Sequence, residues 1–198
     1  MNGTTEQDIL DLLAKGHSHD RIAQRLGVDV VAIRTALALR RADRALARHS
    51  DDSPVWDDWV PRATIIAALG IKPPTFRVDA TKYRTFPPRV DPRFHAVHVA
   101  DLLAFVKHRA AGKVGLPLHS VIATPDWPVR ANPFQGWLLQ CEAMRALGVT
   151  VTMFTYRTDS ARAAENGFGP HRFGSHVLYR DTVVDAWPNL RAPSGKDA

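Results

Sequence analysis

The side chains with the clearest potential chemistry in this sequence are arginines, which fall in two clusters. Residues 34–48 hold five arginines against one acidic residue, and residues 62–95 hold seven basic residues against two acidic ones. Arginine binds phosphate and can also pair with guanine, so such segments suit a polyanion. The net charge of +6 points the same way. A solvated basic surface without a partner is the alternative interpretation.

The sequence contains no recognisable catalytic or metal-binding pattern. Its nine histidines include the close pairs His17/His19, His95/His98 and His171/His176, but none has the paired Cys/His spacing of a structural zinc site. The single cysteine, Cys141, excludes an internal disulfide and a cysteine-based zinc cluster. We find no Walker loop, dinucleotide fingerprint, nucleophile elbow or carboxylate cluster. We therefore expect a protein that is not an enzyme and has no cofactor or metal site.

The elements that would position the arginines are pairs of short helices. Residues 62–77 have the spacing of a helix-turn-helix, because Ile65 and Leu69 share one face of a short helix. Gly70 follows, where a chain leaving a helix often adopts a left-handed conformation. Phe76, six residues after the glycine, returns an apolar side chain to the first helix.

A similar layout occurs earlier in the chain. Ile22 and Leu26 precede Gly27, and Ile33 lies six residues beyond that glycine. Asp29 is placed to cap the second helix. Residues 5–45 resemble the three-helix DNA-binding unit of LuxR-type response regulators and of region 4 of sigma factors. An ordinary helical hairpin is the alternative.

The 56–76 segment reappears 78 residues later. Trp56, Trp59, Leu69, Gly70, Ile71 and Phe76 correspond to Phe134, Trp137, Leu147, Gly148, Val149 and Phe154. Each copy continues into a predicted β-hairpin, with turns at 91–93 and at Gly174-Ser175, and then into an apolar helical stripe. We interpret the two copies as a duplicated domain, in which the recurring tryptophans serve core packing.

These copies resemble the excisionase and AlpA group of MerR-type winged helices. In the first copy the resemblance rests on Leu69-Gly70-Ile71, Phe76, Phe86-Pro87-Pro88 and residues 101–105. In the second copy it rests on Leu147-Gly148-Val149, Phe154 to Arg157, Phe168-Gly169-Pro170 and Val183 to Trp187. The first hairpin departs from the family because it lacks a glycine turn, and Gly169 stands where the family favours proline.

The predicted fold is mainly α, with three tandem helix-turn-helix units, the second and third winged. The expected domains are 1–49 (helix-turn-helix), 56–111 and 134–190 (both winged), with linkers at 50–55 and 112–133 and a disordered tail at 191–198. No run of residues reaches membrane-spanning length, and the first residues lack the features of a signal peptide. We expect a cytoplasmic, nucleoid-associated protein with no membrane partner, and the resemblance implies a bacterial host.

In a helix-turn-helix the second helix enters the major groove, so its outward side chains are the expected DNA contacts. In the first unit these are Val30, Val31, Arg34 and Thr35, with Arg40, Arg41 and Arg44 for phosphate. In the second they are Lys72, Thr75 and Arg77, backed by Lys82 and Arg84, and in the third Thr150, Thr152, Thr155, Tyr156 and Arg157. The wings would add Arg89, Arg93, His171, Arg172 and His176.

The expected function is sequence-specific binding of double-stranded DNA at an extended site. Three non-identical helix-turn-helix units on one chain favour an asymmetric site, because palindromic sites match two-fold symmetric dimers. Such a chain could bind as a monomer, alone or beside other proteins at the same site. The resemblance implies a regulator, in particular a repressor, of a phage, plasmid or integrated element. The alternatives are an excisionase-like bending factor, a centromere-binding partition protein and a protein-interaction module.

Overall fold

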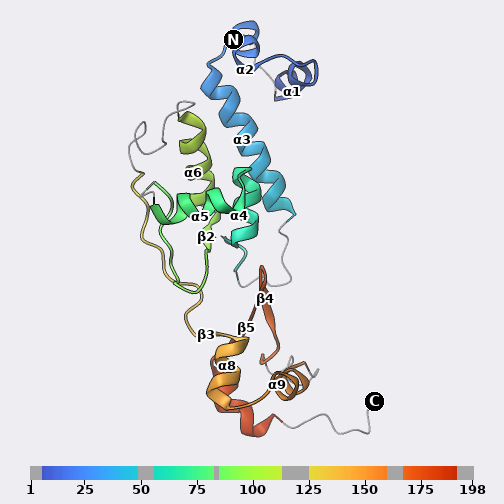
Figure 1. The fold of residues 1–198 in the computed structure, drawn as a ribbon, viewed down its shortest axis with the longest axis vertical. Helices are drawn as coiled ribbons and strands as arrows, with labels where there is room; N and C mark the ends of the chain where they lie inside the picture. The colour runs from blue at the N-terminus through green and yellow to red at the C-terminus, as the bar shows by residue number, and fades with distance from the viewer. Residues whose placement is uncertain (1–5, 49–55, 83–84, 113–124, 160–166, 191–198) are drawn as a thin grey trace. The chain divides into compact units, whose positions relative to one another are not determined.

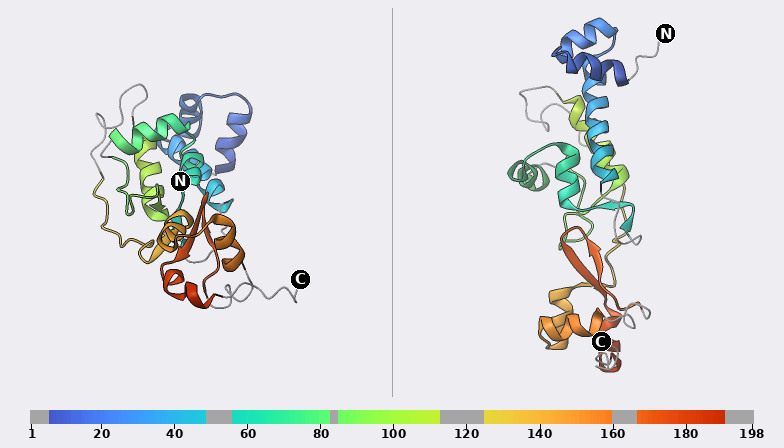
Figure 2. Two further views of the ribbon diagram at one scale, coloured as in Figure 1. Left: turned by 60° about the horizontal axis from the view of Figure 1, so that its bottom comes forward. Right: turned by 90° about the vertical axis from the view of Figure 1, so that its right-hand side faces the viewer.

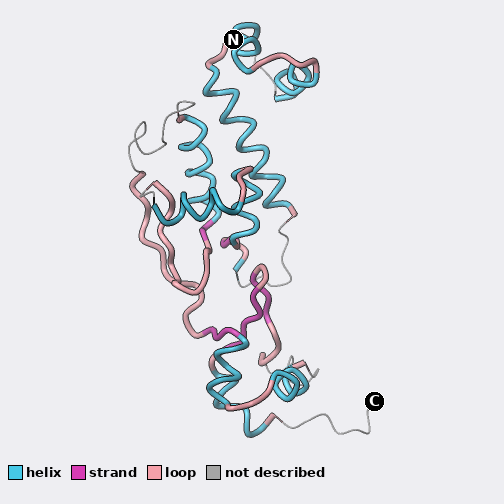
Figure 3. The backbone as a smooth tube through the Cα atoms, in the orientation of Figure 1, coloured by secondary structure: helices cyan, strands magenta, loops and turns pink. Residues whose placement is uncertain are grey.

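The computed structural model describes residues 6–48, 56–82, 85–112, 125–159 and 167–190 (Figure 1). They are mainly helical with two small antiparallel sheets, which confirms the mainly α prediction (Figure 3). The chain divides into two compact units, whereas the sequence analysis expected three domains. Unit 1 comprises the described residues of 1–50 and 58–130, and unit 2 those of 51–57 and 131–198.

The elements of the two units are as follows. Unit 1 contains α1 (Glu6–Ala14), α2 (His19–Leu26), α3 (Val30–Ala47), β1 (Trp59–Val60), α4 (Arg62–Leu69), α5 (Pro73–Lys82), β2 (Val97–His98) and α6 (Val99–Ala111). Unit 2 contains β3 (Trp137–Leu139), α8 (Gln140–Leu147), α9 (Val151–Thr158), β4 (His171–Phe173), β5 (His176–Arg180), α11 (Thr182–Ala186) and the 3₁₀ helix η2 (Trp187–Asn189).

Three helix pairs, α2–α3, α4–α5 and α8–α9, are joined by the same three-residue turn. Each begins with a left-handed glycine: Gly27 has φ 67°, Gly70 φ 61° and Gly148 φ 66°. The residue after each glycine donates its N–H to the carbonyl five residues back, which satisfies the end of the first helix. The apolar residue six positions after the glycine is fully buried, at 0 or 1% exposure, in all three pairs.

Helix α3 contributes to two hydrophobic clusters. Near its start Ile33 packs in a cluster with Ile22 of α2. Further along, Ala42 joins the cluster of Ile65 and Leu102, because α3 runs along α4 and α6 (Figure 2). The helical apolar spacing of α3 continues through this second half. The N-terminal helices and the first copy of the repeat therefore form one unit.

The two copies of the repeat agree in their strands as well as in their helices. Trp59 pairs with His98 between β1 and β2, and Trp137 pairs with Arg180 between β3 and β5. In each copy the residue after the second strand donates its N–H to the carbonyl of the residue before the tryptophan. These bonds join Val99 to Asp58 at 2.8 Å in unit 1 and Asp181 to Gly136 at 3.0 Å in unit 2. Equivalent positions of the two copies are 78 residues apart at the tryptophans, Trp59 and Trp137, and 82 residues apart at their strand partners, His98 and Arg180. The copies thus differ in the length of the segment between these points.

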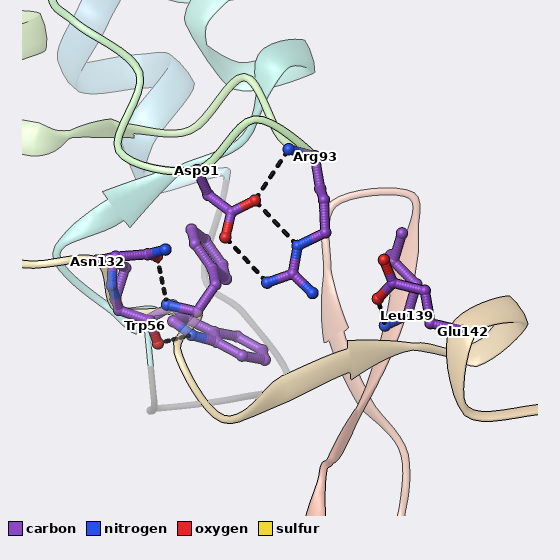
Figure 4. A network of polar contacts seen from close by, with 8 residues as sticks. Trp56, Asp91, Arg93, Asn132, Leu139 and Glu142 are labelled. Atoms are coloured by element: carbon purple, nitrogen blue, oxygen red, sulfur yellow. Dashed lines mark hydrogen bonds and ion pairs between the residues drawn. The ribbon is translucent and has the colours of Figure 1, made fainter. Parts of the chain in front are cut away.

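The predicted hairpin of the second copy is confirmed, and that of the first is wrong. In unit 2, β4 and β5 pair around Gly174-Ser175, with Phe173 opposite His176. In unit 1, β2 pairs with β1 instead, and residues 86–96 form no strand. Pro87 and Pro88 lack the N–H that a ladder needs. Asp91 is 3% exposed and accepts hydrogen bonds from the backbone N–H, Nε and Nη2 of Arg93 at 2.9, 3.0 and 2.9 Å (Figure 4).

Trp56 belongs to unit 2 and is not the structural counterpart of Phe134. The two rings pack on each other, with centroids 5.6 Å apart, and Trp137 lies 4.8 Å from Trp56. The indole Nε1 of Trp56 donates to the carbonyl oxygen of Pro133 at 3.3 Å (Figure 4). A second cluster of unit 2 contains Phe154 and Trp187. The tryptophans at 56, 59, 137 and 187 are buried, which confirms that they serve core packing.

Part of the predicted linker 112–133 is structured in unit 1. Trp127 packs against the main cluster of that unit, with its ring centroid 6.4 Å from that of Phe105. Arg130 donates two hydrogen bonds of 2.7 Å to the carboxylate of Asp101, which raises the pKa of the guanidinium. Residues 125–130 are therefore held on the first copy, while the predicted linker 50–55 and the predicted tail 191–198 lie outside the described residues.

Candidate nucleic-acid interface

Helix α5 presents the polar face that the sequence predicted. Phe76 is 1% exposed and packs edge-on against Phe86 with ring centroids 5.5 Å apart. Thr75 and Arg77 flank this anchor and are both exposed, and Lys72 is exposed just before the first turn of the helix. Three predicted contacts thus lie together at the N-terminal end of one helix. The side chain of Lys82 and the whole of Arg84 lie outside the described residues.

The loop beside α5 contributes one exposed cation. Arg89 is exposed, whereas Arg93 is bound to Asp91 and its Cζ lies 5.1 Å from the ring centroid of Phe94. His95 is partly buried against Phe76. Its pKa is lowered by burial and by the positive charges of Arg89 and Arg62. Of the two predicted wing arginines, Arg89 is the one presented to solvent.

Most of the predicted contacts of α3 are turned toward the protein. Arg34 donates to the carbonyl of Gly112 and Arg41 to that of Leu69, both at 3.4 Å. Arg40 forms an ion pair with Glu6 at 3.1 Å. Val30, Val31 and Thr35 are half-buried, and Arg44 is exposed. Arg34 and Arg41 are seven residues apart and so share a face of the helix, but no sequence signal separates them from Arg44, which is three residues after Arg41.

Helix α9 presents a largely uncharged face. Thr150 caps the helix by accepting the N–H of Met153 at 3.4 Å, and Thr155 accepts from Gln140 at 3.3 Å. The guanidinium of Arg157 lies 4.9 Å from the ring centroid of Trp187. Thr152 and Tyr156 are exposed as predicted. Val151 and Met153, absent from the predicted contacts, are 54 and 43% exposed beside them.

Two side chains of the unit 2 hairpin, His171 and Arg180, pack against Trp137. His171 packs edge-on against Trp137 at 4.8 Å, and burial together with the charge of Arg180 lowers its pKa. Arg180, which the sequence analysis missed, lies 4.1 Å from the ring centroid of Trp137. The register of β3 and β5 places it opposite that tryptophan, and no local sequence pattern predicts this pairing. Arg172 is exposed and His176 is half-buried.

The two units differ in charge. Unit 1 contains 19 of the 26 Lys and Arg residues of the chain and 11 of its 20 acidic residues, for a net charge of +8. Unit 2 has a net charge of −2. Any polyanion would therefore be attracted chiefly by unit 1.

Other kinds of site find no support in the described ranges. No three His, Cys, Asp or Glu side chains come together there as metal ligands would. Among the helices of those ranges, none combines the length and apolar character needed to cross a membrane. Comparison of the chain with protein-family models, curated proteins and solved structures found no match in any of the three.

Proposed function

We propose that this protein binds double-stranded DNA in a sequence-specific manner and that α5 enters the major groove. The observation that carries the proposal is the grouping of Lys72, Thr75 and Arg77 on the exposed N-terminal end of α5, in the unit with a net charge of +8. Side chains at this end of a recognition helix are the ones that meet base edges. Arginine can pair bidentately with guanine, and threonine suits the thymine methyl.

Three features that the helix pairs share support their interpretation as helix-turn-helix units. Each has the left-handed glycine, the three-residue turn and the buried apolar residue that would fix the angle between two consecutive helices. The hairpin of β4 and β5 would be the wing of the third unit. In the second unit the loop with Arg89 would take the place of a wing. In the first, α3 would contribute Arg44 to phosphate and act mainly as a support for α4.

Units 1 and 2 would play different parts on DNA. Phosphate contacts dominate affinity and its dependence on salt, so the charge of unit 1 would supply most of the binding free energy. Thr152, Met153 and Tyr156 of α9 would supply methyl and hydroxyl contacts to bases rather than charge. A site read in this way is asymmetric. A repressor of a mobile element and an excision factor that bends DNA both fit such a reader.

Selection from random-sequence duplexes tests the proposal. The full chain should enrich one asymmetric motif, and its affinity for that motif should fall steeply as salt rises. Absence of any enriched motif, with a flat response to salt, would exclude sequence-specific DNA binding. Gel mobility of fragments with the motif at the centre or at the end then distinguishes a bending factor from a simple repressor.

A second candidate function concerns unit 2. Val151, Met153 and Tyr156 make α9 an exposed apolar surface on a unit of net charge −2, which favours a protein partner over DNA for this helix. Replacing Thr152 and Tyr156 by alanine distinguishes the two. Loss of sequence preference at part of the selected motif would assign α9 to DNA. Unchanged DNA binding would exclude α9 from the DNA interface and leave a protein partner as the remaining candidate.

A further inference from the structure

Unit 1 contains a cavity of about 290 Å³ between α3, α4 and α6. Its floor is apolar and includes Leu37 and Val106, while the exposed His19 and Arg41 lie at its edge. The volume is near the lower end of the range for small-molecule sites, and an apolar lining with a few polar groups is typical of them. The cavity lies entirely within one compact unit.

The polar side chains among the described residues that line this cavity are all basic. Arg34, Arg41, Arg109 and His19 line it, and none of the ten lining residues is acidic. Arg34 and Arg41 come from one face of α3, and Arg109 from the last turn of α6. Three guanidinium groups lining one cavity raise the local positive potential, which favours an anion.

The hydrogen bonds of Arg34 and Arg41 do not neutralise the charges of these two side chains. Arg34 and Arg41 each donate to one backbone carbonyl at 3.4 Å, which is beyond the usual 2.7–3.2 Å range of N–H···O bonds. The acceptors, Gly112 and Leu69, lie at helix C-termini, where the dipole is worth about half a unit charge. Each guanidinium has five N–H donors, so most of them remain available. Among the described residues no carboxylate pairs with either of these two arginines.

We infer that the cavity binds a small organic anion with an apolar body, such as an aromatic carboxylate. The carboxylate would take the fork donors of Arg34 and Arg41, and the ring would lie on the floor formed by Leu37 and Val106. His19 begins α2, whose N-terminal dipole adds to the attraction for an anion. The inference does not depend on DNA binding.

Calorimetric titration of the full chain with 2-naphthoate, without DNA, tests this site. We expect binding of one naphthoate per chain and at least about tenfold weaker binding of the neutral 2-naphthamide, since a charge-assisted pair is worth roughly 1.5–3 kcal/mol. Equal binding of the two compounds, or no binding of naphthoate, would overturn the inference. This comparison uses only the wild-type chain, so it holds whether or not a variant folds.

Variants then locate the bound anion. Arg34→Gln and Arg41→Gln should each weaken naphthoate binding about tenfold, whereas Arg44→Gln, which removes the same charge from an exposed position of α3, should leave it unchanged. Circular dichroism establishes that each variant is folded. A similar loss in all three variants would show nonspecific attraction and would contradict the proposed site.

Discussion

The guanidinium of Arg41 lies against Gly70, the left-handed residue between α4 and α5. A Cβ built on Gly70 would come within 2.8 Å of Cζ and 2.9 Å of Cδ of Arg41. The equivalent Gly148 of unit 2 has a similar φ, 66° against 61°, but its Cβ would meet no atom within 4 Å. One position of the repeat thus serves a conformational need in both copies and a packing need only in the first.

Replacing the two glycines separates these needs. Gly148→Ala should lower the free energy of unfolding of unit 2 by about 1 kcal/mol, the cost of a left-handed alanine. Gly70→Ala should lower that of unit 1 by somewhat more, because the exposed Arg41 side chain must also shift away from the added methyl group. Urea unfolding followed by circular dichroism, with each unit fitted separately, measures both.

The control is a double-mutant cycle with Arg41→Ala. In that background the extra cost of Gly70→Ala should disappear, since the displaced side chain is gone. Strictly additive effects would show that the contact between Arg41 and Gly70 has no energetic consequence.

The division into two units predicts separate unfolding. Phe154 is fully buried and stacks on Trp187, with centroids 5.4 Å apart. Phe154→Ala should therefore destabilise unit 2 by about 3–5 kcal/mol and leave unit 1 unchanged, and Phe76→Ala should do the reverse. Amide hydrogen exchange of both variants resolves the units. Loss of protection throughout the chain in either variant would mean that the units fold as one.

Partly buried histidines predict that stability falls in mild acid. Burial lowers the pKa of His95, His108 and His171. Below the ordinary histidine pKa of about 6.5, the unfolded chain therefore binds more protons than the folded chain. The free energy of unfolding should then decrease as the pH falls from about 6.5 toward the lower pKa values of the folded state. Urea unfolding between about pH 7.5 and 5.5 measures this decrease, in a window above the titration of most carboxylates.

His171 offers a control in unit 2. His171→Gln removes the proton acceptor beside Trp137, so the stability of unit 2 should depend less on pH while that of unit 1 keeps its dependence. A stability of unit 2 that rises as the pH falls would contradict the direction of the pKa shift.

The features predicted correctly from the sequence are local ones. The glycine of each turn and the apolar residue six positions later are set by backbone sterics and helical spacing, so a few residues suffice to identify them. The hairpin of unit 2 follows from Gly174-Ser175, a two-residue turn with the glycine at φ 59°.

The features that were missed depend on contacts between distant residues. The second half of α3 has the same apolar spacing whether it faces solvent or packs on α4, and the sequence does not say which neighbour it meets. Arg34 and Arg41 carry the same charge as Arg44, yet their acceptors lie 78 and 28 residues away along the chain. Likewise, β2 pairs with β1, so that Trp59 lies opposite His98, and not with residues 86–90, which are much nearer in the sequence.

The most direct test of the central claim compares two double variants for binding to the duplex obtained by selection. Fluorescence anisotropy should show that Lys72→Ala/Arg77→Ala weakens binding at least about tenfold and lowers the dependence of affinity on salt, since each contact is worth about 1–3 kcal/mol. The control variant Lys15→Ala/Lys107→Ala removes the same charge from two other exposed positions, since Lys15 follows α1 and Lys107 lies in α6. It should change the affinity by no more than about threefold. Equal effects of the two double variants would contradict the assignment of α5 as the helix that reads DNA.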